Sequence, residues 1–109
     1  MRLQWSKKAR RKVDAVAVYI SRTFGEWSSR AFLEEVDEVA TLLLRHPNLG
    51  PIERFLANEP IMYRSLVVNK LNKIIYTVKN DVIYIVDFWD TRREPSAQAT
   101  QTSDTNTPA

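Results

Sequence analysis

The fold is decided by residues 72–89, which read NKIIYTVKNDVIYIVDFW. Two runs rich in β-branched and aromatic residues flank Asn80 and Asp81. Such runs favour β-strands, and Asn and Asp tolerate the positive φ angles of a tight turn. The stretch therefore predicts an antiparallel hairpin. Its second run is almost continuously apolar as far as Val86, which predicts a central strand with little exposed surface.

Two further segments extend this sheet in the sequence-based prediction. Residues 61–68 (IMYRSLVV) alternate in part, and residues 69–71 are expected to turn the chain into the next strand. Residues 2–5 (RLQW) alternate and end in an aromatic residue, which predicts a short strand near the start of the chain. The stretch before residue 61 contains three prolines, which disfavour helices and strands: Pro47, Pro51 and Pro60. Residues 48–60 are therefore expected to form a loop.

Two helices are predicted between the first strand and this loop. Ser6 is a suitable N-cap for a helix that runs to about Phe24, where Gly25 can end it. A second helix is expected from Glu26 or Ser28 to His46. Both segments place apolar residues at the spacing of one helix face. These residues are Ala9, Val13, Val16, Ala17, Ile20 and Phe24 in the first helix, and Phe32, Val36, Val39 and Leu43 in the second.

The predicted order of elements is β-αα-βββ. It indicates an α+β domain over residues 1–95, in which an antiparallel helical hairpin packs on a small, mainly antiparallel sheet. The composition changes after Pro95, because residues 96–109 contain no aromatic residue and no Leu, Ile, Val or Met. Such a segment buries too little apolar surface to offset its ordering entropy. Residues 96–109 are therefore predicted to form a disordered polar tail.

Length and composition exclude several classes of protein. A chain of 109 residues with 44% hydrophobic and 27% charged residues is long enough for one domain. No apolar run approaches the roughly 20 residues of a membrane span, and no secretory signal follows the basic start, so a cytoplasmic protein without a membrane partner is expected. The chain has no cysteine, one histidine and two glycines. A zinc site, a glycine-rich phosphate loop and a small-molecule cofactor are therefore not expected.

The charge is distributed unevenly. The net charge is +3, yet residues 1–25 alone contribute seven cations against one acid. Five of these cations stand at the predicted start of the first helix: Lys7, Lys8, Arg10, Arg11 and Lys12. Cations there oppose the helix dipole, so they do not serve helix stability. They form either a solvated face or a patch for an acidic partner, which could be nucleic acid or an acidic protein segment.

A second group of cations belongs to the predicted sheet: Arg64, Lys73, Arg92 and Arg93. In a three-stranded meander, Lys73 and the arginine pair are expected to converge at one edge, with Arg64 nearby if its side chain shares their face. Such a group can hold a phosphate or stabilise the charge that develops during phosphodiester cleavage. The alternative is ordinary pairing of the strand-end arginines with Asp87, Asp90 or Glu94.

Several motifs in combination resemble the RelE/ParE superfamily of bacterial type II toxins. They are HPNLG (residues 46–50), YRSL (63–66), KIIYTV (73–78) and VIYIVDFWDTRREP (82–95). The similarity covers residues 1–95. It implies a cytoplasmic toxin that a cognate antitoxin wraps and neutralises.

The resemblance leaves two mechanisms open. RelE-like members cut messenger RNA on the ribosome with basic residues of the sheet, and Arg64, Lys73 and Arg92 occupy comparable positions. ParE-like members inhibit DNA gyrase and are not known as nucleases. In this chain Leu66 stands where RelE has a second lysine, and no tyrosine or histidine follows Trp89. The main hypothesis is therefore ParE-like inhibition of gyrase, and the alternative is a RelE-like endoribonuclease.

Overall fold

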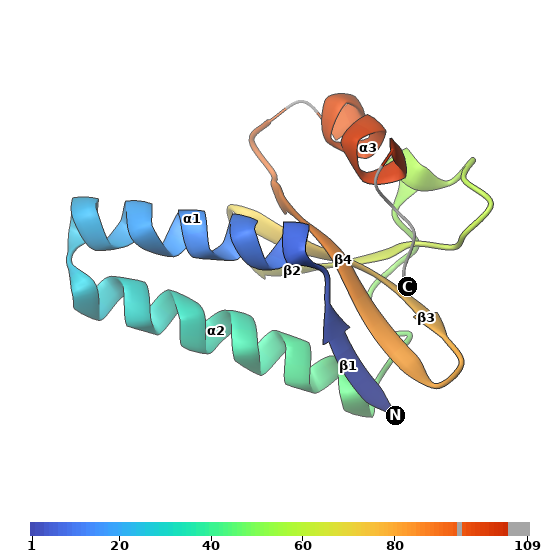
Figure 1. Ribbon diagram of the computed structural model, residues 1–109, viewed down its shortest axis with the longest axis horizontal. Coiled ribbons are helices and arrows are strands. Elements are labelled where there is room, and N and C mark those ends of the chain that lie inside the picture. Colours follow the sequence, from blue (N-terminus) through green and yellow to red (C-terminus); the bar gives the residue numbers. More distant parts are fainter. Residues whose placement is uncertain (94, 105–109) are drawn as a thin grey trace.

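The computed structural model describes residues 1–93 and 95–104. The elements alternate as the sequence predicts as far as the fourth strand (Figure 1). They are β1 (Arg2–Trp5), α1 (Lys7–Phe24), α2 (Glu26–Arg45), a 3-10 turn η1 (Arg54–Leu56), β2 (Arg64–Asn69), β3 (Asn72–Lys79), β4 (Val82–Asp90) and α3 (Pro95–Asp104). This is the predicted α+β fold, with η1 and α3 in addition.

The strands form one mixed sheet in the order β1-β4-β3-β2. β1 pairs with β4 in parallel, whereas the other two pairs are antiparallel. Asn80 and Asp81 have φ angles of 51° and 65°, as predicted for the tight turn between β3 and β4. The central place of β4 is also confirmed. β2 begins at Arg64 and not at Ile61 as predicted. The residues just before it contact the preceding loop, where the Glu53 amide donates to the Tyr63 carbonyl.

A β-bulge in β4 changes the direction of its side chains. Ile75 pairs with Asp87 and Tyr76 pairs with Ile85, so Val86 is an additional residue on β4. Before the bulge, Ile85 points into the core beneath the helices. At the bulge, Val86 joins a second cluster on the opposite face of the sheet. The bulge therefore shifts the alternation of side chains along β4: Ile83 and Ile85 face the helices before it, and Phe88 faces them after it.

The helical hairpin covers one face of the sheet (Figure 1). The main core lies there, and among its members Val13 of α1, Leu43 of α2 and Ile83 of β4 are 1% exposed or less. Ser6 is the N-cap of α1, as predicted: its Oγ accepts from the Ala9 amide at 3.0 Å and donates to the Val86 carbonyl at 3.0 Å. The same hydroxyl therefore starts the helix and joins it to the central strand.

The opposite face of the sheet is covered by η1 and α3 (Figure 1). A second core lies between this face of the sheet and the two elements that cover it. It is formed mainly by Leu56, Tyr63, Ile75, Trp89 and Ala99. Among the helices in the described part of the chain, none is both long enough and apolar enough to cross a membrane.

The prediction of a disordered tail is wrong for residues 96–104, which belong to α3. Residues 105–109 lie outside the described residues. The helix is held mainly by polar contacts. The Gln98 side chain exchanges hydrogen bonds of 3.0 Å with the backbone of Asp90, and Thr102 is 1% exposed against Asp87 and Trp89. The prediction of disorder was based on the absence of large apolar residues from this segment, so it did not take these polar contacts into account.

Deletion of residues 96–109 is expected to lower the free energy of unfolding by about 2 kcal/mol, because it uncovers Trp89 and removes a hydrogen bond to a buried carboxylate. In a domain of this size such a loss lowers the Tm by roughly 8 °C or more. Thermal unfolding followed by circular dichroism measures the change. Thr102→Ala is expected to reproduce part of it, and Thr100→Ala, at an exposed position of the same helix, is the control. An unchanged Tm for the deletion would restore the original prediction.

Candidate functional site

Arg64 lies on the helical side of the sheet. It pairs directly with Tyr76, whose ring belongs to the core beneath the helices, and directly paired residues share a face. Its Nη1 donates to the Gly50 carbonyl at 2.9 Å. The Tyr76 hydroxyl accepts from the Gly50 amide at 3.0 Å and donates to the Pro47 carbonyl at 2.7 Å. Arg64 therefore helps to fix the loop that follows α2.

Lys73 lies on the opposite side of the sheet, three residues before Tyr76 on the same strand. Its ammonium group forms an ion pair with Glu53 and lies 5.0 Å from the centre of the Trp89 ring. Glu53 is only 3% exposed, and its second carboxylate oxygen accepts from the Phe55 amide at 3.0 Å. Lys73 therefore neutralises a buried carboxylate.

Arg92 and Arg93 follow β4 and are exposed. The Arg92 side chain donates to both carboxylate oxygens of Asp90, at 3.1 and 3.2 Å, and the Arg92 amide also donates to Asp90. This is the ordinary pairing that the sequence left as the alternative. The hydrogen bonds from Arg92 lower the pKa of Asp90.

The cations of the sheet therefore have three different sets of partners. Lys73 pairs with Trp89 in the ladder, so it lies near the end of β4 from which Arg92 follows. Arg64 lies on the other face and contacts a loop carbonyl. The partial convergence of Lys73 and Arg92 at one end of the sheet does not include Arg64. A catalytic role for these three residues stays a prediction.

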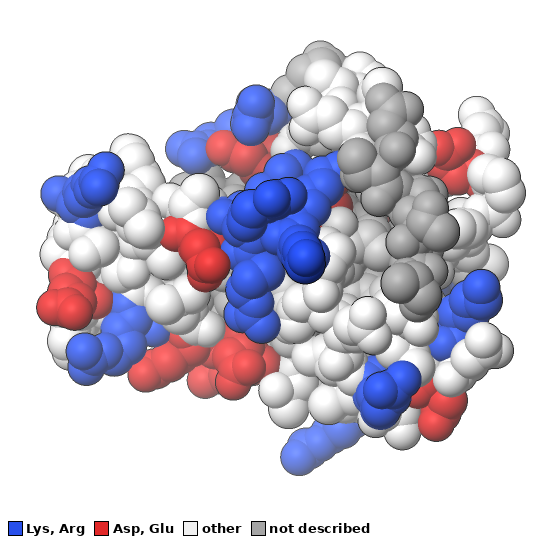
Figure 2. All heavy atoms as spheres, in the orientation of Figure 1, with Lys and Arg blue, Asp and Glu red and all other residues white. Residues whose placement is uncertain are grey.

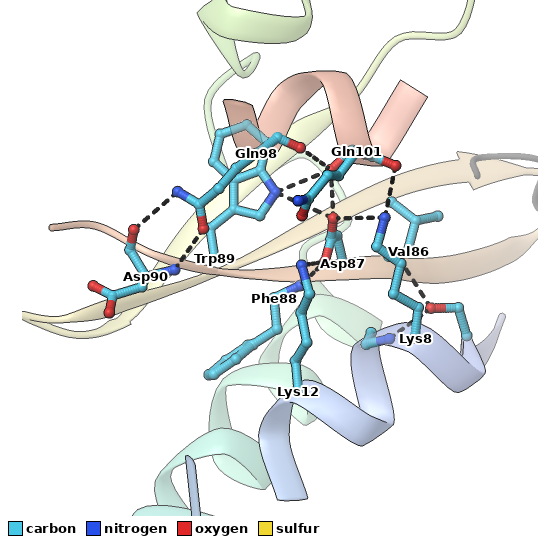
Figure 3. Close-up of polar contacts among 12 residues, drawn as sticks. Lys8, Lys12, Val86, Asp87, Phe88, Trp89, Asp90, Gln98 and Gln101 are labelled. Atoms are coloured by element: carbon cyan, nitrogen blue, oxygen red, sulfur yellow. Dashed lines mark hydrogen bonds and ion pairs between the residues drawn. The ribbon is translucent and has the colours of Figure 1, made fainter. Parts of the chain in front are cut away.

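The most strongly built polar cluster surrounds Asp87 in the middle of β4 (Figure 3). Its side chain is 0% exposed. Lys12 approaches it at 2.8 Å and Lys8 at 3.3 Å, both from α1, while the Thr102 hydroxyl of α3 donates to it. Lys8 also donates to the Gln101 carbonyl at 2.7 Å. The cluster thus joins α1, β4 and α3 at one buried charge.

Burial alone would raise the pKa values of Asp87 and Glu53. In each case hydrogen bonds and the neighbouring ammonium charge outweigh burial, so the pKa lies below its ordinary value. The main donors are Lys12 and Thr102 for Asp87, and Lys73 for Glu53. Both carboxylates are therefore ionised near neutral pH, and each is balanced by lysine.

This arrangement predicts how stability depends on pH. A carboxylate whose pKa is lowered by folding contributes stability that is complete above its unfolded pKa and is lost as pH falls through the folded value. The unfolded values are about 3.9 for Asp and 4.3 for Glu. The free energy of unfolding is therefore expected to fall below about pH 4. Urea denaturation between pH 7 and pH 2.5 measures this, and Asp87→Asn should flatten the curve. A stability that stays constant down to pH 3 would contradict the assignment.

The five cations at the start of α1 fall into two groups. Lys8 and Lys12 point inward to Asp87, whereas Lys7, Arg10 and Arg11 are exposed. Figure 2 shows Lys and Arg side chains gathered over this part of α1. The Arg10 guanidinium lies 4.8 Å from the centre of the Trp5 ring. Two of the five cations therefore neutralise a buried carboxylate, and the other three form an exposed basic surface.

Sequence reasoning missed the structural role of Asp87 and Glu53. The signal for Asp87 was an acid within the apolar run YIVDFW, together with lysines four residues apart on an adjacent helix. Glu53 lies in a loop, and nothing in the local sequence pairs it with Lys73. Among the described residues, no group of three His, Asp or Glu side chains is arranged to hold a metal ion.

Comparisons with known proteins were made for sequence and for structure. The sequence profile of the family described as "ParE toxin of type II toxin-antitoxin system, parDE" matches residues 3–95. A chain from the solved structure described as "Chromosomal ParDE TA system from P. aeruginosa" is similar in fold, with a TM-score of 0.69 and 21% sequence identity. The match covers 83% of this chain and 95% of that chain. A search of curated protein sequences gave no significant match.

Proposed function

Because this chain belongs to the ParE toxin family of type II toxin–antitoxin systems, we propose that it acts by inhibiting DNA gyrase and that a cognate antitoxin neutralises it. The observation that carries the proposal is the family match, which extends from β1 past the end of β4. Inhibition would take place through contacts between proteins, without chemistry by the toxin itself.

The arrangement of the sheet cations supports this proposal over RNA cleavage. A phosphodiester-cleaving site needs cations aimed at one point, where the charge develops. Arg64 instead contacts Gly50, Lys73 contacts Glu53, and Arg92 contacts Asp90. The sequence after Trp89 also has no tyrosine or histidine that could act as an acid or base.

A supercoiling assay tests the target directly. Purified gyrase and relaxed plasmid are incubated with increasing amounts of the protein, and the products are separated by gel electrophoresis. Loss of supercoiling, or accumulation of cleaved plasmid, is the expected result. A type I topoisomerase assayed in parallel is the control, and adding the antitoxin in equal amount should restore supercoiling.

The endoribonuclease alternative needs its own assay. Messenger RNA is added to a purified translation system with the toxin, and cleavage is mapped by primer extension. The proposal expects intact transcripts. Ribosome-dependent cleavage that is lost in Arg92→Ala and retained in the neighbouring Arg93→Ala, together with unaffected gyrase, would overturn it.

A further inference from the structure

The exposed cations at the start of α1 form a basic surface. We define the α1 basic strip as Lys7, Arg10 and Arg11, which lie on one helix face at i, i+3 and i+4. No ion pair joins them to a carboxylate within residues 1–93 and 95–104. The first turn of α1 has no acidic residue, so these cations oppose the helix dipole without local compensation.

The strip borders a hollow between α1 and the edge strand β1. The hollow has a volume of about 610 Å³, and it is lined by Leu3, Gln4, Trp5, Ser6 and the three cations of the strip. Stacking on Trp5 holds the Arg10 guanidinium over this hollow. A cation held in this way loses less side-chain entropy when it binds an anion.

The charge of this region is strongly positive. Residues 1–14 carry six Lys and Arg against Asp14, and Lys8 and Lys12 among them face the buried Asp87. The exposed acids of α2 lie on the other helix of the hairpin: Glu26, Glu34, Glu35, Asp37 and Glu38. A polyanion would therefore be drawn to the start of α1 and repelled by α2.

The composition of the strip favours nucleic acid over an acidic protein. Protein interfaces have an apolar centre, yet the most exposed aromatic side chains, Phe24 and Trp27, lie at the far end of the hairpin. At the strip, Leu3 and Trp5 are half-buried, and Arg10 covers the Trp5 ring. Duplex DNA presents one negative charge about every 1.7 Å along its axis, so cations about 5–6 Å apart on a helix can each meet a phosphate.

We propose that the α1 basic strip binds the phosphate backbone of duplex DNA without regard to sequence. This goes beyond gyrase inhibition, since it concerns DNA alone and holds whether or not gyrase is the target. Three phosphate contacts predict weak binding, with a Kd in the range of about 10⁻⁴ to 10⁻⁶ M, and a slope of log K against log salt of about −3.

Fluorescence anisotropy of a labelled 20-base-pair duplex tests the proposal, with the full chain titrated at several KCl concentrations. The wild type should bind with the slope given above. The variant Lys7→Gln/Arg10→Gln/Arg11→Gln should lose at least tenfold in affinity and most of the slope. Arg22→Gln/Arg30→Gln/Arg45→Gln removes the same charge from exposed positions elsewhere on the helices and should lose much less. Lys8 and Lys12 are untouched, so Asp87 stays neutralised.

Three results would overturn the proposal. One is the absence of binding at low salt. Another is equal weakening by the two triple variants, which would mean that only net charge matters. The third is binding of an acidic peptide, such as a labelled deca-glutamate, with no binding of the duplex. If the strip variant does not fold, the single variant Arg11→Gln replaces it, and its slope should be smaller by about one.

Discussion

Asp87→Asn is expected to lower the free energy of unfolding by about 3 kcal/mol. Removing one partner of a buried ion pair costs about 3–5 kcal/mol, since it leaves a buried charge without compensation. The lower end of this range applies because Lys8 and Lys12 remain 20% and 29% exposed and can turn towards water. The substitution keeps the shape of the side chain, so the change reports on charge and hydrogen bonding rather than on packing.

Urea denaturation at pH 7 measures this loss. Asp81→Asn is the matched control, because Asp81 is 76% exposed and its ion pair is with the chain terminus. Its effect should stay within about 0.5 kcal/mol. Equal effects at positions 81 and 87 would show that the buried cluster contributes no more than a surface pair.

Gly50→Ala is expected to cost about 3 kcal/mol, a typical upper value for forcing an extra carbon atom into a packed site. A Cβ atom at this position would overlap the backbone carbonyl of Ser65 and lie 3.0 Å from the Tyr76 ring. Neither group can move easily, because Ser65 is in the sheet and Tyr76 is fully buried. The loop would have to shift and lose the hydrogen bonds between Gly50 and Tyr76 and between Arg64 and Gly50.

Differential scanning calorimetry compares Gly50→Ala with Asn48→Ala, an exposed position of the same loop. The loop control should leave the Tm nearly unchanged. If Gly50→Ala also leaves the Tm unchanged, the loop does not pack against the sheet as closely as the structure indicates.

The helices and the hairpin could be predicted because their signals are local. Val13, Ala17 and Leu43 follow the helical period, and Asn80 and Asp81 tolerate the positive φ angles of a tight turn. The central place of β4 was predicted from its apolar character. These features depend on neighbours along the chain, so one sequence is enough to reveal them.

The polar contacts could not be predicted, because they join residues that are distant in sequence. Glu53 of the loop before β2 meets Lys73 of β3, and Asp87 of β4 meets Lys12 of α1. α3 escaped prediction for the same reason. Its position depends on the hydrogen bond from Thr102 to Asp87 of β4, which is 15 residues away in sequence.

The pairing of β1 with β4 has a consequence for the time at which the protein acquires its shape. Ser6 and Val86, which this pairing brings together, are 80 residues apart. During synthesis the helical hairpin emerges first, while the central strand that covers its apolar face does not yet exist. The entropy cost of closing so long a loop comes before the stabilising contacts between β1 and β4 form. The pairing of these two strands is therefore expected to be a late and slow step of folding. At about 5–20 residues per second, the ribosome thus needs roughly 5–20 seconds to produce the chain, and any product that stops before β4 lacks the central strand of its core.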